Sequence, residues 1–355
     1  MVARTRPAAP IRSRPAGRVL QAPRLAAALL AALLLLGASA PARAEGGSYI
    51  LATATTGGTY YPVGVALATL VTLKLEPEAG VRLSAISSAG SVENLKLLRT
   101  NEVQFALLQG LFGAWAWRGE GAVARAGRQE NLRAITLLWP NVEHFVLSAD
   151  LAASGTVADL AALGDARFSI GSRNSGTEHS GRTILANLGH DPDALNLAYL
   201  GYGASSDALR NGTIVGMNAP AGPPVGAVTR AAAILGDGIR LLGFTPEQAA
   251  RADGGMGLWT PYVIAAGTYP DQDTDVNTIA QPNLLVVNAA IDEATVYAIT
   301  KTIYENLGFL QSVHKATRAM ALESAIDGLP LPLHPGAERY YREQGLAIPK
   351  RLEAP

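Results

Sequence analysis

The sequence predicts an α/β protein of two lobes, each a mixed, mostly parallel sheet flanked by helices. Apolar, β-prone runs alternate with helical patterns along most of the chain, which is typical of doubly wound sheets. The 311 residues that remain after the predicted leader (355 − 44) are more than one typical core accommodates. A local device also recurs, in which a strand ends in Gly, Ser or Thr and opens a helix. It occurs at Thr55–Tyr60, Ser88–Asn94, Asn174–Glu178 and Tyr202–Ser206.

The first 44 residues are typical of a cleavable secretory signal peptide. A basic leader without acidic residues precedes an unbroken Leu/Ala run of 12 residues, Leu25–Leu36. That run is shorter than the roughly 18 residues that span a bilayer, which disfavours a retained anchor. Ala42-Arg43-Ala44 supplies the small-x-small pattern that precedes a cleavage point. The sequence therefore predicts an exported protein, cleaved after Ala44 in preference to Ala40.

The composition excludes several functional classes. The chain has no Cys, which excludes disulfides, thiolate catalysis and Cys-based metal sites. The whole chain has 29 basic and 29 acidic residues, and because the leader takes Arg and no acid, the mature chain is net acidic. No basic patch favours nucleic acid or an anionic membrane. The five His residues show neither H-x-H nor HExxH spacing, so no metal site is predicted.

The first half of the mature chain is expected to alternate strands with helices. Its predicted elements are strands at 49–52, 81–86, 103–109, 132–139 and 143–148, and helices at 63–75 and from Ser91. Pro140-Asn141 is expected to separate the last two strands. Ser91 is a good N-cap residue, and Asn94 falls in the first turn of the same helix.

The second half continues this alternation before changing character. Its predicted elements are a short helix at 156–163, strands at 167–171, 195–200, 214–219 and 239–244, and a helix through Gly189 capped by Ser175 or Thr177. The last third is expected to hold a loop at 254–260, a strand at 262–264, an extended run at 278–288 and helices at 291–311 and 316–325. Pro335 fits the first position of a final helix.

The Gly-rich and Ser-rich turns form the predicted ligand site. A helix start aims backbone N–H groups and the positive end of the helix dipole at one point, which suits an anion. Gly57 and Gly58 let the backbone approach a ligand, although neither G-x-G-x-x-G nor the P-loop pattern is present. Ligands of doubly wound sheets bind at the carboxyl ends of strands, so the turns are expected to share a cleft. An ordinary βα turn with helix capping remains the alternative for each turn.

Several segments together are similar, in sequence and in order, to the TAXI-type solute receptors of TRAP (tripartite ATP-independent periplasmic) transporters. The matching segments are Thr56–Pro62, Gly90–Leu95, Ser175–Glu178, Ala266–Pro270 followed by Gln272-Asp273, and Leu333–Tyr341. The resemblance implies a two-lobed periplasmic binding protein. Lobe I would comprise residues 45–143 and 281–355, lobe II would comprise residues 144–280, and crossover strands would join them.

The same resemblance implies a function without chemistry or cofactor. As a monomer in the periplasm, the protein would capture a small carboxylate such as glutamate, glutamine or 2-oxoglutarate and deliver it to the TRAP permease membrane subunits. The two lobes would close on the ligand by a population shift. Two positions depart from the family pattern, because Gly110 stands where many relatives have Asp and Arg173 replaces a Pro or a small residue. A receptor for a sensor kinase and a binding protein of an ABC importer are the alternatives.

The expected ligand-binding residues come from the turns and strand ends of both lobes. They are Gly58, Thr59, Tyr60, Ser88, Ser91, Asn94, Gln109, Arg173, Ser175, Gly176, Thr177 and Gly222. Helix N-termini and hydroxyl groups can hold a carboxylate without Arg, so Arg173 is either a bidentate contact or a surface residue. Ser175 lies near Glu178 and His179, but no G-x-S-x-G elbow surrounds it. No catalytic residue is therefore predicted, and an exported hydrolase is disfavoured.

Overall fold

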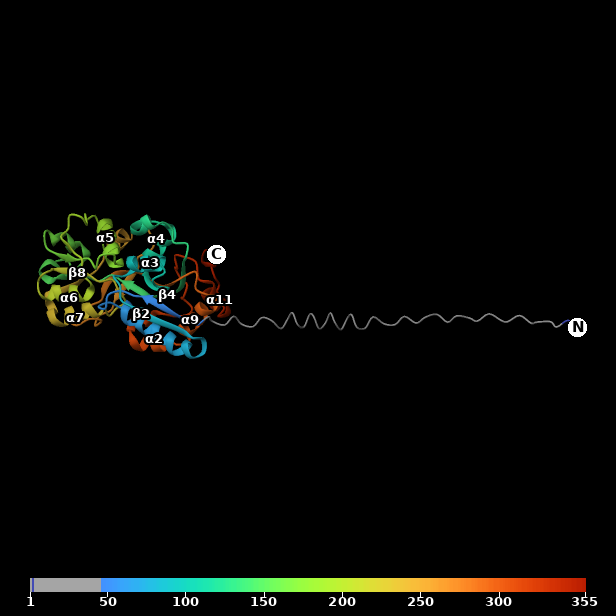
Figure 1. Ribbon diagram of the computed structural model, residues 1–355. Helices are drawn as coiled ribbons and strands as arrows, with labels where there is room; N and C mark the ends of the chain where they lie inside the picture. The colour runs from blue at the N-terminus through green and yellow to red at the C-terminus, as the bar shows by residue number, and fades with distance from the viewer. Residues whose placement is uncertain (1, 3–45) are drawn as a thin grey trace. The chain divides into compact units, whose positions relative to one another are not determined.

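Two mixed β-sheets organise the part of the chain that the structure describes (Figure 1). The computed structural model describes residue 2 and residues 46–355, so the predicted signal peptide and its cleavage point lie outside the described residues. The first sheet has the order β10-β11-β3-β1-β2, with β4 paired to β11. The second has the order β7-β6-β8-β5-β9. The predicted α/β class with two sheets is confirmed.

The first sheet begins with three strands from the first half of the chain. They are β1 (Gly47–Ala52), β2 (Val81–Ile86) and β3 (Phe105–Gln109). β1 pairs parallel with both of the others, as expected for strands joined by helices. Every residue of β3 is buried, which explains why this strand reads as a continuous apolar run. The carboxyl ends of these strands all lie at one edge of the sheet.

Long antiparallel strands complete the first sheet. They are β4 (Leu132–Val142), β10 (Thr260–Ile264) and β11 (Val276–Asn288), and β11 pairs antiparallel with β3, β4 and β10. The predicted break at Pro140-Asn141 is wrong, because β4 runs through both residues. Pro140 lies opposite Pro282, and the ladder shifts its register beside this pair. The proline nitrogens cannot donate a hydrogen bond, and they are tolerated there because the irregular register does not need a donor at these positions.

The second sheet consists of short strands. They are β5 (Phe145–Ser148), β6 (Phe168–Ser169), β7 (Leu197–Ala198), β8 (Gly216–Asn218) and β9 (Ile239–Leu242). β6 pairs parallel with β7 and β8, whereas β5 pairs antiparallel with β8 and β9. Antiparallel pairing is more frequent than expected, because β11 and β5 run against the strands that the βα turns follow.

Helices flank both sheets. They are α2 (Tyr60–Ala79), α3 (Ser91–Arg99), α4 (Gly110–Arg118), α5 (Gly176–Leu188), α6 (Tyr202–Arg210), α7 (Gly226–Leu235), α8 (Pro246–Asp253), α9 (Glu293–Glu305), α10 (Leu307–Val313) and α11 (Pro335–Glu343). Short 3₁₀ segments are η1 (Gly121–Ala126), η2 (Ala149–Leu151), η3 (Val157–Leu163), η4 (Gly236–Gly238), η5 (Lys315–Ala319) and η6 (Lys350–Leu352). Within residues 46–355, no helix combines the length and the apolar character that a membrane span needs.

Three local predictions about helices are corrected. The helix expected at 291–311 is two helices, α9 and α10, which meet at Asn306. The helix expected at 316–325 is only η5, because the His314 side chain and carbonyl close a short turn with Ala316 and Thr317. The N-cap of α3 is Gly90 and Ser91 is the first helical residue, since the cap position has a φ of 124°, which only glycine adopts readily.

The chain passes between the two sheets directly after β4. Val142 exchanges two backbone hydrogen bonds with Ala221, and the Ala219 N–H donates to His144 O. Glu143 N–H donates to Ile279 O of β11, so three segments run together at this crossing. β10 and the whole of β11 belong to the first sheet. The predicted lobe boundaries at 143/144 and 280/281 remain a prediction.

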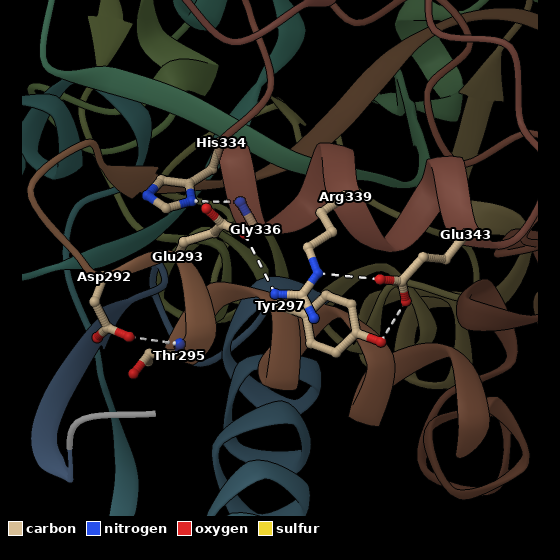
Figure 2. A network of polar contacts seen from close by, with 8 residues as sticks. All are labelled: Asp292, Glu293, Thr295, Tyr297, His334, Gly336, Arg339 and Glu343. Atoms are coloured by element: carbon tan, nitrogen blue, oxygen red, sulfur yellow. Dashed lines mark hydrogen bonds and ion pairs between the residues drawn. The ribbon is translucent and has the colours of Figure 1, made fainter. Parts of the chain in front are cut away.

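The final helix α11 packs against α9, which in turn packs against α2 (Figure 1). The α9–α11 junction, drawn in Figure 2, comprises Asp292, Glu293, Thr295, Tyr297, His334, Gly336, Arg339 and Glu343. His334 caps α11 by accepting the Gly336 N–H, and Pro335 occupies the first helical position as predicted. A Cβ on Gly336 would lie 2.2 Å from Glu293 O. The two helices therefore approach as closely as a glycine permits.

Candidate functional site

A cavity lies where the βα turns of the first sheet meet those of the second. It encloses about 440 Å³, which includes its opening to solvent. Its two sides are close together, since a Cβ on Gly58 would lie 3.0 Å from the Tyr202 ring. The lining residues are Ala54, Thr55, Gly58, Thr59, Tyr60, Ala89, Gly90, Ser91, Gln109, Asn141, Ser172, Ser175, Gly176, Thr177, Gly201, Tyr202, Pro220 and Ala221.

Five helices begin at this cavity. α2, α3 and α4 start there from the first sheet, and α5 and α6 start there from the second, since each has its N-cap or first turn among the lining residues. Among the described residues, Ser175 of α5 is the one N-cap residue of these five whose side chain caps its own helix, and the Leu111 N–H in the first turn of α4 donates to Gln281 Oε1. Free N–H groups and the positive ends of helix dipoles thus gather around one small space. This arrangement favours an anionic group.

Glycines allow the turns of the two sides to touch. A Cβ on Gly57 would lie 2.6 Å from Gly203 N, and one on Gly58 would lie 3.0 Å from the Tyr202 ring. A Cβ on Gly176 would lie 2.7 Å from the Gln109 side chain of the opposite side. The Gly-rich composition of these turns therefore serves contact between the two sides as well as access to the cavity.

Direct hydrogen bonds join the two sides. Thr59 Oγ1 donates to Gly222 O at 2.7 Å, and this bond is buried. The backbone N–H of Glu93 donates to Asn174 O at 3.2 Å. The N–H of Ala227 donates to Gly57 O at 3.2 Å. The structure therefore shows the two sides in a closed arrangement.

Two tyrosines form rigid polar walls of the cavity. The Tyr60 hydroxyl donates to Asn283 Oδ1 at 2.5 Å, and the Tyr202 hydroxyl donates to Pro220 O at 2.7 Å. Thr177 Oγ1 lies 2.6 Å from the Tyr202 hydroxyl. Burial raises the pKa of both tyrosines above the usual range, so both remain neutral.

Four buried amide side chains lie where β3, β11 and β4 pass the cavity, and we call them the amide cluster: Gln109, Asn141, Gln281 and Asn283. In the strand register Gln109 faces Asn283, and Asn141 faces Gln281. Asn283 uses both ends of its amide, accepting from Tyr60 and donating to Trp139 O. Within residues 46–355, Gln109 Oε1, Asn141 Nδ2 and Gln281 Nε2 lack a hydrogen-bond partner. Gln109 and Asn141 line the cavity.

A comparison with known families places this chain. The model of the NMT1-like family matches residues 51–345, which is most of the chain. This protein belongs to the NMT1-like family.

Several solved structures are similar to this chain at low sequence identity. The NMT1-like chain is similar to a protein of Bordetella bronchiseptica RB50 with a TM-score of 0.50 and 15% identity, over 88% of this chain and 86% of the other. For the alkanesulfonate-binding protein SsuA from Xanthomonas axonopodis pv. citri, bound to MOPS, the values are 0.43 and 14%, over 84% of each chain. For a TRAP periplasmic solute-binding protein from Roseobacter denitrificans with bound β-D-glucuronate they are 0.42 and 12%, over 75% and 81%. At these identities the likeness concerns the fold alone.

Most of the predicted ligand-binding residues of this NMT1-like protein line the cavity. They are Gly58, Thr59, Tyr60, Ser91, Gln109, Ser175, Gly176 and Thr177. The structure brings them together from both sheets, although their role as ligand contacts stays a prediction. Ser175 caps α5, as expected, by accepting the Glu178 N–H at 2.9 Å.

The other four predicted residues lie outside the cavity lining. Asn94 is fully buried and donates to the carbonyls of Thr53 and Leu107, while it accepts from Ser88. Ser88 and Asn94 thus hold the ends of β1 and β3 together. Gly222 contributes its carbonyl to the bond from Thr59, and Trp139 leaves no room for a side chain there.

The two departures from the TAXI pattern have structural explanations. The Arg173 guanidinium lies 3.7 Å from the centre of the Tyr199 ring, which is a cation–π contact away from the cavity lining. A Cβ on Gly110 would lie 2.6 Å from Pro282 Cγ, so the start of α4 packs against β11 without space for Asp. Neither position therefore changes the cavity wall directly.

Several lining residues are absent from the expected ligand-binding set. Thr55, Asn141, Ser172 and Tyr202 are the polar ones, and Pro220 and Ala221 also line the cavity. Asn141 belongs to the expected strand break, whereas the structure has it as a buried amide inside β4. A lone amide next to apolar strand residues was the available signal. Ser172 and Tyr202 belong to turns that the sequence does identify.

A buried carboxyl group lies at the crossing between the sheets. Glu143 accepts from Asn218 Nδ2 at 3.1 Å and from Trp259 Nε1 at 3.3 Å. Burial raises the pKa of Glu143 from 4.5 to about 7, and these two hydrogen bonds oppose that rise. Its neighbour His144 binds Val142 O and the Tyr269 hydroxyl, and burial lowers its pKa to about 4. Burial thus favours the uncharged forms of both side chains at the crossing.

Proposed function

We propose that this protein is an exported receptor that binds a small carboxylate between its two sheets and presents it to a membrane transporter. The observation that carries the proposal is the convergence of five helix N-termini from both sheets on one cavity. An anion held there would accept hydrogen bonds from backbone N–H groups, which carry partial positive charge at the start of each helix. The lining contains no Lys or Arg, so a multiply charged phosphate is less well matched than a carboxylate.

The finer assignment rests on the sequence resemblance. The segments around Thr56–Pro62, Ser175–Glu178 and Leu333–Tyr341 support a TAXI-type receptor of a TRAP transporter. On this assignment the ligand is glutamate, glutamine or a related carboxylate such as 2-oxoglutarate. The partners are then the membrane subunits of the TRAP permease, and the protein acts in the periplasm.

The mechanism follows from contacts between the two sides. In the closed arrangement Thr59 bonds to Gly222, and Gly57 and Gly176 touch the opposite side. A ligand that contacts both sides stabilises this arrangement by its differential affinity for the closed form. The narrow space inside implies that the sides separate to admit the ligand. Ser175 Oγ already accepts the Glu178 N–H as a helix cap, so it is not proposed as a nucleophile. Binding and release then require only that the two sides move, without a chemical step.

A thermal-shift screen of the purified mature protein tests this function. The panel contains amino acids, dicarboxylates, 2-oxoacids and sugars. A ligand at 100 times its dissociation constant adds about 2.7 kcal/mol, which raises the unfolding midpoint by a few degrees in a protein of this size. We expect shifts with one or more carboxylates and none with neutral sugars. Shifts confined to sugars, or none after unfolding and refolding to remove a copurified solute, would contradict the proposal.

A further inference from the structure

The cavity offers its ligand an unusual pair of unpartnered groups. Seven buried side-chain atoms of residues 46–355 lack a hydrogen-bond partner, and two of them belong to residues of the cavity lining. Asn141 Nδ2 is a donor and Gln109 Oε1 is an acceptor. The two residues are 1% and 4% exposed, so neither is served by bulk water. A buried polar atom without a hydrogen-bond partner lowers the stability of the protein unless another group, such as a ligand, forms the missing bond.

Strand pairing places both groups within reach of one small molecule. β11 lies between β3 and β4, with Asn283 opposite Gln109 and Gln281 opposite Asn141. Since neighbouring strands are about 4.8 Å apart, the backbones of Gln109 and Asn141 are on the order of 10 Å apart, and both side chains line the same cavity. The ends of one amino-acid-sized ligand can therefore contact both.

Donors are plentiful at this cavity, because the helix starts supply N–H groups. Three carbonyls near it are already engaged. Gly222 O accepts from Thr59, Pro220 O from Tyr202, and Thr55 O from the Gly58 N–H. Among the described lining residues, Gln109 Oε1 is the buried side-chain acceptor without a partner, so a donor group of the ligand can complete it.

We propose that Gln109 and Asn141 are the specificity-determining pair, and that the ligand is a carboxylate that also carries an ammonium or amide N–H donor. This inference rests on the proposed receptor function and narrows it. Asn141 Nδ2 donates to an acceptor of the ligand, and Gln109 Oε1 accepts from its nitrogen. A 2-oxoacid lacks that donor and leaves Gln109 unpartnered. The site therefore prefers an α-amino acid over the 2-oxoacid of the same carbon skeleton.

Calorimetric titration of the mature protein with matched pairs tests this preference, for example glutamate against 2-oxoglutarate. We expect the amino acid to bind about tenfold more tightly or better, since one hydrogen bond to a charged group separates the two. Gln109→Met removes the acceptor and should lower the affinity for the amino acid about tenfold, with little effect on the 2-oxoacid. Asn141→Asp should weaken both ligands, because it replaces a donor by a carboxylate.

The chain offers a matched control. Gln129 is also 4% exposed and has an unpartnered Oε1, but it lies outside the cavity lining. Gln129→Met should change neither affinity. Unfolding midpoints measured without ligand check that each variant folds. If Asn141→Asp does not fold, Gln109→Met alone is sufficient for the test. Equal binding of amino acid and 2-oxoacid, or equal weakening of both by Gln109→Met, would overturn the inference alone. Absence of binding by every carboxylate would overturn the receptor function, and the inference with it.

Discussion

The cavity and the α9–α11 junction use similar residues in opposite ways. Both contain a helix start, a glycine at a close contact and buried polar side chains. At the junction the groups complete one another, since Arg339 contacts Glu293 and Glu343 and lies over the Tyr297 ring (Figure 2). Tyr297 also donates to Glu343 at 2.6 Å. Thr295 Oγ1 is the exception, as a buried atom without a partner among the described residues.

At the cavity, by contrast, two buried amide atoms of the lining residues, Gln109 Oε1 and Asn141 Nδ2, have no partner among the described residues. The two regions therefore contribute to different properties, the junction to the stability of the fold and the cavity to ligand binding. Polar groups that are satisfied inside the protein hold the first sheet and its helices together. Groups that are buried and unsatisfied are available for a ligand, at a cost in stability of the free protein. Substitutions in the two regions should therefore change different measured quantities.

Gly336→Ala should have the largest effect on stability. Its Cβ would lie 2.2 Å from Glu293 O and 2.6 Å from Tyr297 N, so the backbones of α9 and α11 must separate. We expect a loss of about 3 kcal/mol in the free energy of unfolding, measured by urea denaturation, without a change in ligand affinity. Gly308→Ala is the control, because its Cβ would meet nothing within 4 Å. Equal stability of the two variants would contradict the close packing of the junction.

The two carboxylates Glu143 and Glu343 should differ in their response to pH. Hydrogen bonds from Tyr297 and then Arg339 lower the pKa of Glu343, whereas burial raises that of Glu143 to about 7. Between pH 4.5 and 7 the folded protein therefore holds the Glu143 proton and the unfolded chain does not. The contribution of Glu143 to stability is full below pH 4.5 and falls as the pH rises through 7, by on the order of 3 kcal/mol.

Urea denaturation across this pH range measures the effect. Glu143→Gln should flatten the decline and raise the stability above pH 7. Glu343→Gln should leave the decline in place. If the free energy of unfolding fell equally with pH in the wild type and in Glu143→Gln, another group would be responsible for the pH dependence.

Gly176→Ala should weaken binding while sparing stability. Its Cβ would lie 2.7 Å from the Gln109 side chain and 2.8 Å from Ser91 Oγ, which belong to the opposite side of the cavity. Closure is then opposed by about 2 kcal/mol, which corresponds to a loss of affinity of about 30-fold. Titration calorimetry measures the loss, and the unfolding midpoint without ligand should be unchanged. A lowered midpoint with normal affinity would reverse the proposed difference between the regions.

Tyr341→Phe should have the smallest effect. The Tyr341 hydroxyl donates to Ile135 O at 3.0 Å and is buried. Its loss should cost about 1 kcal/mol of stability and leave ligand binding intact. Tyr340→Phe is the matched control, because the Tyr340 hydroxyl has no hydrogen-bond partner within residues 46–355. An equal cost for both tyrosines would point to ring packing instead of the hydrogen bond.

The sequence predicts the cavity better than the sheets around it. The turns are encoded locally, because apolar runs that end in Gly, Ser or Thr specify a strand, a turn and a helix start. Gly58, Thr59, Ser175 and Gly176 could therefore be placed at strand ends before the fold was known. The α/β class followed from the same alternation.

Features that depend on pairing between distant segments could not be predicted. Asn141 becomes a cavity residue only because β4 continues past Pro140 beside β11. Asn94 is in the predicted turn, but its side chain turns inward to the carbonyls of Thr53 and Leu107. Both outcomes are set by the register of the first sheet, which local patterns do not contain.

The distance between the two sides of the cavity tests the central claim most directly. The chain lacks Cys, so Lys96→Cys on α3 and Ala186→Cys on α5, both exposed, can carry a spin-label pair in the mature protein. Double electron–electron resonance then measures the distance with and without the carboxylate found by the thermal-shift screen. The receptor account predicts a longer or broader distribution without ligand and a single shorter distance at saturation. Identical distributions in the two conditions would contradict closure on the ligand.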